Sequence, residues 1–143
     1  MGGNDTLMGG GGDDTLDGGV GNDRLIGGEG QDQFVFSTTL NIKTNIDVVA
    51  DFQTGIDTIV LSEAVFAQLA DLDTGASPSA ENLVIGTAAL DANDYLVYNS
   101  STGVLSYDAD GSGTASVAVA FAKIELNGVP PTDLSATDFI VSA

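Results

Sequence analysis

The first part of the chain places one large apolar residue at the centre of each of several short segments, and glycines and polar residues separate these segments. The central apolar residues recur every nine positions and are Leu7, Leu16, Leu25 and Phe34. An inward-pointing side chain between two outward-pointing neighbours is the pattern of a very short β-strand. The predicted strands cover residues 6–8, 15–17, 24–26 and 33–35.

Longer apolar runs follow residue 36, and those rich in β-branched and aromatic residues predict further strands. These strands are expected over residues 46–50, 58–61, 95–98, 104–107 and 116–126. A turn at 53–55 joins the first two, and Asn99–Gly103 joins the next two as a β-hairpin. Glu63–Leu72 instead spaces its apolar residues as a helix does, with Ser62 in the N-cap position. We therefore expect one short helix that packs on the core.

A nine-residue repeat underlies the first pattern. Three contiguous units, at 9–17, 18–26 and 27–35, read Gly-Gly-x-Gly-x-Asp-x-(Leu/Phe)-x, and an incomplete unit with Asp5 in the aspartate position precedes them. Glycines allow the backbone to adopt positive φ and to turn tightly. Each unit is therefore expected to form a turn and a strand, and two units one coil, so that alternate repeats stack on the same side.

This stacking is expected to bring the repeat aspartates together in pairs. Asp5 lies next to Asp23, and Asp14 next to Asp32, at one strand spacing of about 4.8 Å. Carboxylates this close repel each other unless a cation lies between them. Hard oxygen ligands, turn carbonyls and a flexible geometry favour Ca²⁺ over Mg²⁺ or Zn²⁺. The sequence predicts roughly two to four calcium ions in the repeats.

Three further aspartates flank the predicted turn at 53–55, namely Asp47, Asp51 and Asp57. They either hold another calcium ion or cap the solvent-facing ends of the strands. Both interpretations stay open, and we include Asp51 and Asp57 among the candidate metal ligands.

Two other interpretations of the glycine-rich segment fit less well. A flexible linker has no reason to keep aspartate and leucine in register. A phosphate-binding loop needs Gly-x-Gly-x-x-Gly at the start of a helix, and residues 19–24 lack the last glycine. The surrounding aspartates would also repel phosphate.

The charge of the chain agrees with a metal-dependent fold. Its 143 residues, one domain's worth, carry 21 acidic and 3 basic side chains, for a net charge of −18. Such a chain repels nucleic acid and anionic membrane surfaces, so we expect neither as a partner. It also resists compaction until cations neutralise it. A hydrophobic content of 43% is too high for a disordered acidic tail.

The absence of two residue types excludes several kinds of chemistry. The sequence has no cysteine and no histidine, which excludes disulfides, thiol chemistry and the commonest general base. We therefore expect that this chain is not an enzyme. No apolar run approaches the ~20 residues that span a bilayer, and no signal peptide opens the sequence, so we expect no membrane insertion.

The order of the motifs resembles that of a known family. The repeats are followed by Phe34–Phe36, Asp47–Phe52, Tyr107–Gly113 and a terminal Asp138–Val141. Together they are similar to the C-terminal region of RTX-type exoproteins, which carry haemolysin-type calcium-binding repeats and leave bacteria through type I machinery. The block from Phe34 to Ser62 most resembles the C-terminal domain of serralysin-like proteases.

The resemblance implies an all-β fold, with a calcium-binding parallel β-roll over 1–36 and a β-rich C-terminal cap with one short helix over 37–143. It implies that Ca²⁺ is held by the first six positions of each repeat, chiefly by the aspartates. The implied metal-binding residues of the roll are Asn4, Asp5, Gly9, Gly10, Gly11, Gly12, Asp13, Asp14, Gly18, Gly19, Val20, Gly21, Asn22, Asp23, Gly27, Gly28, Gly30 and Asp32. The implied secretion signal consists of Asp138, Phe139, Ile140 and Val141.

The same resemblance implies partners and a location. The partners are a type I secretion ABC transporter and an upstream domain of a larger parent protein, and the location is extracellular, for a secreted bacterial protein. Scarce cytosolic Ca²⁺ would leave the charged chain expanded for export. Outside, millimolar Ca²⁺ would fill sites of roughly 10⁻⁴–10⁻³ M affinity and drive folding. Met1 occupies a repeat position where glycine is expected, so the sequence is expected to begin within a repeat of that longer protein.

The alternative function is a carbohydrate-binding auxiliary module of a secreted polysaccharide-active enzyme, as in alginate epimerases. Because the chain has 3 basic residues, tight binding to a polyanion would require bridging calcium. Titration with alginate and with neutral glycans separates the two functions.

Overall fold

The computed structural model describes residues 2–40, 45–69, 76–78, 80–111 and 118–142. Within these residues the regular elements are strands and short 3₁₀ turns, which confirms the all-β class. The strands are β1 (Thr6–Gly11), β2 (Thr15–Leu16), β3 (Arg24–Glu29), β4 (Gln33–Phe36), β5 (Asp47–Val49), β6 (Thr58–Ser62), β7 (Leu83–Ile85), β8 (Leu96–Asn99), β9 (Val104–Tyr107), β10 (Val119–Ile124) and β11 (Phe139–Ser142). The 3₁₀ turns are η1 (Ala67–Leu69), η2 (Ala80–Asn82) and η3 (Ala136–Asp138).

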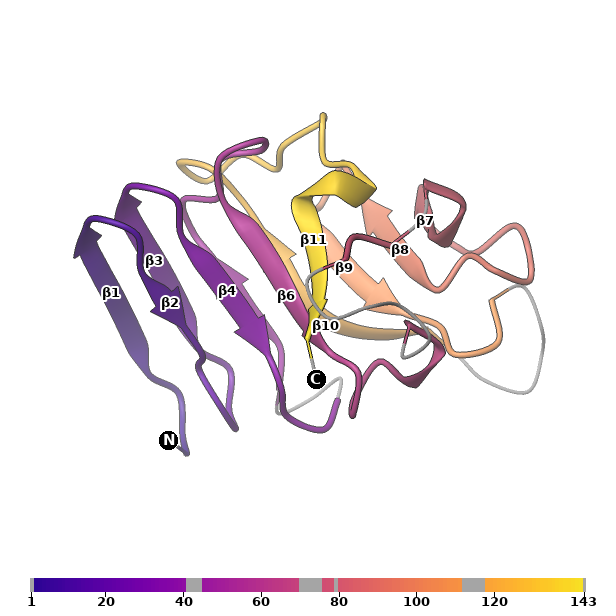
Figure 1. Ribbon diagram of the computed structural model, residues 1–143, viewed down its shortest axis with the longest axis horizontal. Helices are drawn as coiled ribbons and strands as arrows, with labels where there is room; N and C mark the ends of the chain where they lie inside the picture. The colour runs from indigo at the N-terminus through magenta and orange to yellow at the C-terminus, as the bar shows by residue number, and fades with distance from the viewer. Residues whose placement is uncertain (1, 41–44, 70–75, 79, 112–117, 143) are drawn as a thin grey trace.

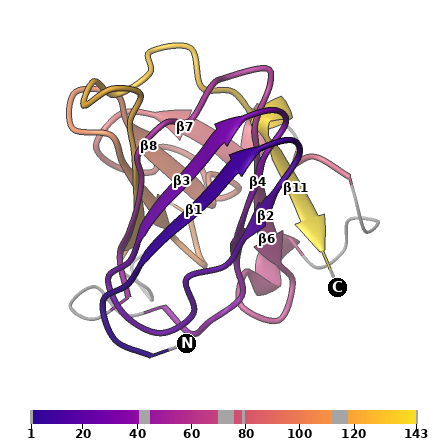
Figure 2. The same ribbon diagram turned by 90° about the vertical axis from the view of Figure 1, so that its left-hand side faces the viewer.

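The repeats form a coil in which every second repeat is stacked in parallel. In β1 and β3, Thr6 pairs with Arg24, and in β2 and β4, Thr15 pairs with Gln33. Both offsets equal two nonapeptides, so the predicted stacking is confirmed. The strands lie where they were predicted, but β1 and β3 continue into the glycines that were expected to turn, and β2 has only two residues. Figure 2, which views the coil from its N-terminal end, shows β1 and β3 on one side and β2 and β4 on the other.

The coil continues past the last glycine-rich repeat. β5 pairs in parallel with β3, and β6 pairs in parallel with β4. β5 begins at Asp47, and β6 begins directly after Asp57. Both segments read Asp-x-apolar and so repeat the second half of the nonapeptide without its glycines. A last coil is completed by β10 beside β5 and by β11 beside β6.

Two sheets result from this winding (Figure 1). One has four parallel strands in the order β11-β6-β4-β2, and the other has seven strands in the order β1-β3-β5-β10-β9-β8-β7. The predicted hairpin is present as the antiparallel pair β8–β9, with Gly103 at φ 80° in its turn. The antiparallel strands lie at the end of the molecule away from β1.

The core thickens from the repeats toward the later strands. Leu16, Leu25 and Phe34 are buried between the two sheets, whereas Leu7 in the first coil is only partly buried. Further along, Phe34 meets Phe52 with ring centroids 6.1 Å apart, and Phe66 meets Phe121 at 4.9 Å. Each fully buried side chain of this size contributes roughly 1.5–3 kcal/mol. The first coil therefore has the least apolar burial to hold it in place.

The α-helix expected over 63–72 is wrong for the part that the structure describes. Ser62 ends β6, and its carbonyl accepts hydrogen bonds from the amides of Val65 and Phe66, at 3.0 and 2.9 Å. One 3₁₀ turn, η1, follows. Phe66 and Leu69 are both buried because residues three apart share a face of a 3₁₀ helix. The described residues include no helix long and apolar enough to cross a bilayer.

Candidate metal centre

The stacked turns approach one another so closely that glycine is required. A Cβ atom on Gly28 would collide with the carbonyl oxygen of Gly10 in the preceding coil, and one on Gly30 would collide with that of Gly12. Both glycines also have positive φ, at 102° and 132°. The repeat glycines thus allow the carbonyl oxygens of one turn to face the backbone of the next.

The repeat aspartates join neighbouring coils through their Oδ1 atoms. The amide of Asp5 donates to Asp23 at 2.7 Å, and the amide of Asp14 donates to Asp32 at 3.0 Å. The predicted pairs Asp5/Asp23 and Asp14/Asp32 therefore lie together. In each pair, the later aspartate orders the turn of the earlier one.

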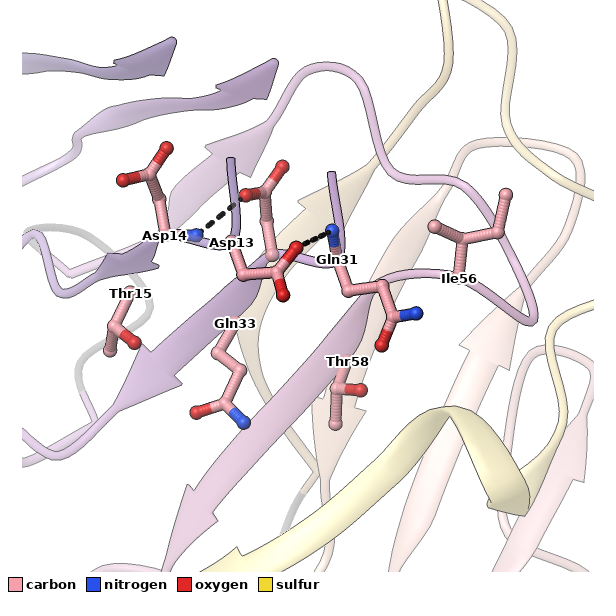
Figure 3. Close-up of a pocket in the computed structure, with 8 residues that line it drawn as sticks. Asp13, Asp14, Thr15, Gln31, Gln33, Ile56 and Thr58 are labelled. Atoms are coloured by element: carbon pink, nitrogen blue, oxygen red, sulfur yellow. Dashed lines mark hydrogen bonds between the residues drawn. The ribbon is translucent and has the colours of Figure 1, made fainter. Parts of the chain in front are cut away.

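The residues before these aspartates make the opposite connection. The side chains of Asn4 and Asp13 accept hydrogen bonds from the amides of Asn22 and Gln31, at 3.0 and 2.8 Å. Figure 3 shows the contact of Asp13 with the Gln31 backbone. The two rows of side chains consequently hold adjacent coils together from both directions.

The second carboxylate oxygen of each repeat aspartate finds no hydrogen-bond partner among the described residues. The Oδ2 atoms of Asp5, Asp14, Asp23 and Asp32 are all buried and unsatisfied. The side chains of Asp23 and Asp32 are only 2% and 1% exposed. A buried acceptor without a partner costs about 1–3 kcal/mol, and more when it is charged. These oxygens are therefore suited to a cation that supplies the missing partner.

The donor set is that of a hard cation. In the described part of the chain, no group of three or more acidic side chains comes together to hold an ion. An ion at these turns would therefore take oxygens from an aspartate pair, Asp5/Asp23 or Asp14/Asp32, and from the turn carbonyls of the first four repeat positions. Calcium accepts six to eight such oxygens in a flexible arrangement. The residues present fit Ca²⁺.

A surface hollow lies next to the Asp14/Asp32 pair. A hollow of about 250 Å³ lies beside these turns on the outer side of β2, β4 and β6. Its lining residues are Asp13, Asp14, Thr15, Gln31, Asp32, Gln33, Ile56 and Thr58 (Figure 3). The hollow thus adjoins Asp14 and Asp32, whose Oδ2 atoms are themselves buried.

The two candidate ligands outside the repeats bind backbone amides. Asp51 accepts hydrogen bonds from Gly27 and Gly28, at 2.9 and 2.8 Å. Asp57 accepts from Asp32 at 3.1 Å and from Gln53 at 2.8 Å. Both hold the last glycine turn through hydrogen bonds to the backbone. Asp57 is buried, however, and does not cap a solvent-facing strand end as expected. The role of both as metal ligands stays a prediction.

Two residues that were not included among the candidate metal ligands also accept from the glycine turns: Asp47, whose role the sequence left open, continues the row of repeat aspartates, and Asn45 lies two residues before it. Asp47 accepts a hydrogen bond from the Asp23 amide at 3.0 Å, and Asn45 accepts one from Gly21 at 3.0 Å. For Asp47 a signal was present, because Asp47-Val48-Val49 repeats the Asp-x-apolar half of the nonapeptide. Asn45 has no counterpart in the repeat and could not be found from its spacing.

Burial of Asp47 and Asp57 makes the stability of the fold depend on pH. Burial raises the pKa of Asp47 from 3.8 to about 6; the hydrogen bond from the Asp23 amide lowers it, and the charges of Asp23 and Asp17 raise it. Burial likewise raises the pKa of Asp57. Folding raises this pKa, so the folded state is favoured by protonation of Asp47. This contribution to the free energy of unfolding is complete below about pH 3.8 and is lost as the pH rises through about 6, where the buried carboxyl ionises.

Substituting Asp47→Asn is therefore expected to stabilise the chain at neutral pH. Asparagine keeps an oxygen for the Asp23 amide and removes the buried charge. We expect the gain in unfolding free energy over the wild type to grow from near zero at about pH 4 to roughly 1–2 kcal/mol at about pH 8. Urea unfolding in millimolar Ca²⁺ at several pH values measures it. A difference that stays constant over this range would contradict the assignment.

The residues of the expected secretion signal, 138–141, lie apart from the aspartate pairs. Asp138 accepts hydrogen bonds from Gly55 at 2.8 Å and from Ser135 at 2.9 Å. Phe139, Ile140 and Val141 form most of β11. The tail is thus attached to the turn at 53–57 and not to the glycine turns.

Comparison with known proteins assigns the first part of the chain. A family model described as the RTX calcium-binding nonapeptide repeat, in 4 copies, matches residues 1–34. Residues 1–34 are thus RTX repeats, which bind calcium ions, and the rest of the chain has no assignment. A search of curated proteins finds no match.

Proposed function

We propose that this chain is the calcium-responsive C-terminal region of a larger bacterial exoprotein, similar to the C-terminal domain of serralysin-like proteases. In this proposal it folds on binding Ca²⁺ outside the cell and carries a signal for type I secretion. Repeats of this kind are typical of secreted bacterial proteins. The proposal assigns no reaction to the chain, which has neither cysteine nor histidine.

One observation carries the calcium-dependent part. The buried Oδ2 atoms of the repeat aspartates, at Asp5, Asp14, Asp23 and Asp32, receive no hydrogen bond from the part of the chain that the structure describes. Without a cation they are uncompensated charges in a chain of net charge −18. Binding of Ca²⁺ to the coiled form alone stabilises that form by mass action. The repeats therefore serve as a folding switch set by the calcium concentration.

A calcium titration of Asp32→Asn tests this function. Asparagine at this position keeps an oxygen that can accept from the Asp14 amide but loses the negative charge of the unpartnered oxygen. We expect the calcium affinity of the Asp14/Asp32 pair, measured by isothermal titration calorimetry, to fall at least ~10-fold, equivalent to about 1.4 kcal/mol.

The matched control is Glu29→Gln, in the same repeat. Glu29 is exposed, and this substitution removes the same charge without touching a buried oxygen. We expect its calcium affinity to stay close to that of the wild type. Equal affinities in all three proteins would refute the role of Asp32, and the absence of calcium binding by the wild type would refute the function as a whole.

A further inference from the structure

A second hollow lies apart from the glycine turns, between the turn that follows β5 and the loop that follows β10. Figure 1 shows these two segments along the same edge of the molecule. The hollow has a volume of about 440 Å³, and its lining residues fall within 52–54 and 126–133. Most of them are apolar. Its size and lining are those of a binding pocket, which in proteins typically measures ~300–1,000 Å³.

The loop that forms one wall of the hollow is fixed by hydrogen bonds. Leu126 and Val129 exchange two backbone hydrogen bonds, at 2.9 and 3.1 Å, across a tight turn. The hydroxyl of Tyr98, whose side chain is 0% exposed, donates to the carbonyl of Pro131 at 2.7 Å. A ligand therefore meets a wall that is already formed, and little conformational entropy is lost when it binds.

The hollow presents apolar surface to the solvent. Phe52, which is 0% exposed, lies at its base, whereas Leu126 and Val129 are 38% and 65% exposed. Exposed apolar side chains gathered around a hollow are typical of an interaction site. Pro130 and Pro131 have no backbone N–H to donate, so a partner is expected to dock here through its side chains and not as an added strand.

One charged group lies beside this apolar surface. Asp133 is the only charged residue among the described residues that line the hollow, and it is exposed. Its Oδ2 accepts a hydrogen bond from the hydroxyl of Thr54 at 2.8 Å, which holds the carboxylate at the rim. Burial, with a smaller contribution from the charge of Asp133, raises the pKa of Tyr98 to about 12. The rim is therefore negative, and the base is apolar.

We propose that this hollow binds a basic segment of a partner polypeptide, with an apolar side chain in the hollow and a neighbouring Lys or Arg paired with Asp133. Charge selects this occupant, because Asp133 and the net charge of −18 repel an anionic partner. A second copy of this chain fits less well, since it has 3 basic residues, and Arg24 and Lys123 already pair with Glu125. The inference goes beyond the proposed function and requires only the folded chain.

Titration of the full chain with a short basic peptide, acetyl-Leu-Arg-amide, tests the proposal. The isotope-labelled chain is kept in millimolar Ca²⁺, and heteronuclear NMR follows its backbone amides. We expect the signals of Thr54, Leu126, Val129 and Thr132 to shift, with a dissociation constant on the order of 1 mM. Shifts confined to other parts of the chain, or no shifts at all, would overturn the proposal.

Two further peptides separate the apolar contribution from the charge. Acetyl-Gly-Arg-amide keeps the charge without the apolar side chain, and we expect it to bind at least ~10-fold more weakly. Acetyl-Leu-Gln-amide keeps the side chain without the charge, and we expect binding about 3-fold weaker, as for an exposed ion pair. Equal binding of the two arginine peptides would indicate unspecific attraction to an acidic surface and would refute the proposed hollow.

Three variants at exposed positions complete the test. Val129→Ser is expected to weaken binding of acetyl-Leu-Arg-amide ~3–10-fold, and Asp133→Asn to abolish the preference for arginine over glutamine in the peptide. Leu90→Ser is the control, because Leu90 is 74% exposed and does not line the hollow. We expect its affinity to equal that of the wild type. Circular dichroism verifies that all three variants are folded. Equal affinities of Val129→Ser and Leu90→Ser would contradict the proposal.

Discussion

Excess chelator is expected to abolish most of the β-sheet signal of this chain in the far-ultraviolet circular dichroism spectrum, and millimolar Ca²⁺ to restore it. The coiled form combines a net charge of −18 with four buried carboxylate oxygens in the repeats that have no hydrogen-bond partner within the described ranges. The first coil adds little apolar burial to offset these charges, since Leu7 is only partly buried. A cation is therefore the main source of compensation.

The expected size of this effect follows from linkage. A site filled at about one hundred times its dissociation constant contributes about 2.7 kcal/mol. Two such sites, one for each aspartate pair, reach the lower end of the ~5–15 kcal/mol that stabilises a domain. Loss of both sites therefore removes a free energy comparable to the whole stability of a marginal domain.

The control separates calcium from general screening of charge. Sodium chloride at an ionic strength equal to that of the calcium buffer should leave the chain unfolded, and Mg²⁺ should restore little, because it demands a near-ideal octahedral site and keeps its water. A spectrum that is the same in chelator and in Ca²⁺ would show that the fold does not depend on the metal.

The substitution Gly28→Ala is expected to destabilise the calcium-loaded chain far more than Gly10→Ala. Both glycines have nearly the same positive φ, at 102° and 103°, so both variants bear the ~1–2 kcal/mol cost of a left-handed alanine. Only at Gly28 does the added Cβ meet a backbone atom, the carbonyl oxygen of Gly10. At Gly10 it enters open space.

The contact at Gly28 forces the two coils apart. A backbone carbonyl cannot rotate away as a side chain can, so we expect a further ~1–3 kcal/mol of destabilisation, as for overpacking. Urea denaturation of both variants in saturating Ca²⁺ measures the difference in unfolding free energy. Equal values for the two would mean that positive φ alone accounts for the glycines, and that the coils do not approach each other as the structure indicates.

The strands of the repeats and the aspartate pairs followed directly from the spacing of residues. A period of nine with one inward residue leaves little freedom for the chain, and the offset of 18 residues in the pairing is two periods. The position of Asp5 beside Asp23 then follows directly from this period. The candidate calcium ligands could be predicted because they lie within single repeats, and a local turn brings them into position.

The continuation of the aspartate rows could not be obtained by counting. Asp23 contacts Asp47 at a separation of 24 residues, and Asp32 contacts Asp57 at 25. Insertions between the coils change the interval, while the hydrogen bond to the backbone amide stays the same. Only packing of β5 on β3 and of β6 on β4 selects these partners.

The prediction of a helix after β6 was wrong because tertiary packing, and not local spacing, sets the backbone path there. Its apolar spacing is compatible with two kinds of turn, and the sheet decided between them. Because Ser62 is paired with Ser142 in the sheet, the chain leaves β6 by a turn and reaches the core through η1. Local periodicity shows which side chains, such as Phe66 and Leu69, are buried, but not the backbone path that buries them.

The sequence by itself determined the coiled repeats and the cation that suits them, because both depend on residues within one or two nonapeptides. The tertiary structure alone decided where the coil ends and what closes it. Gly55 and Asp138 are 83 residues apart, and no local pattern encodes a contact at that distance. It forms because the open edge of β6 is completed by a strand whose buried face, Phe139 and Val141, fits the core there.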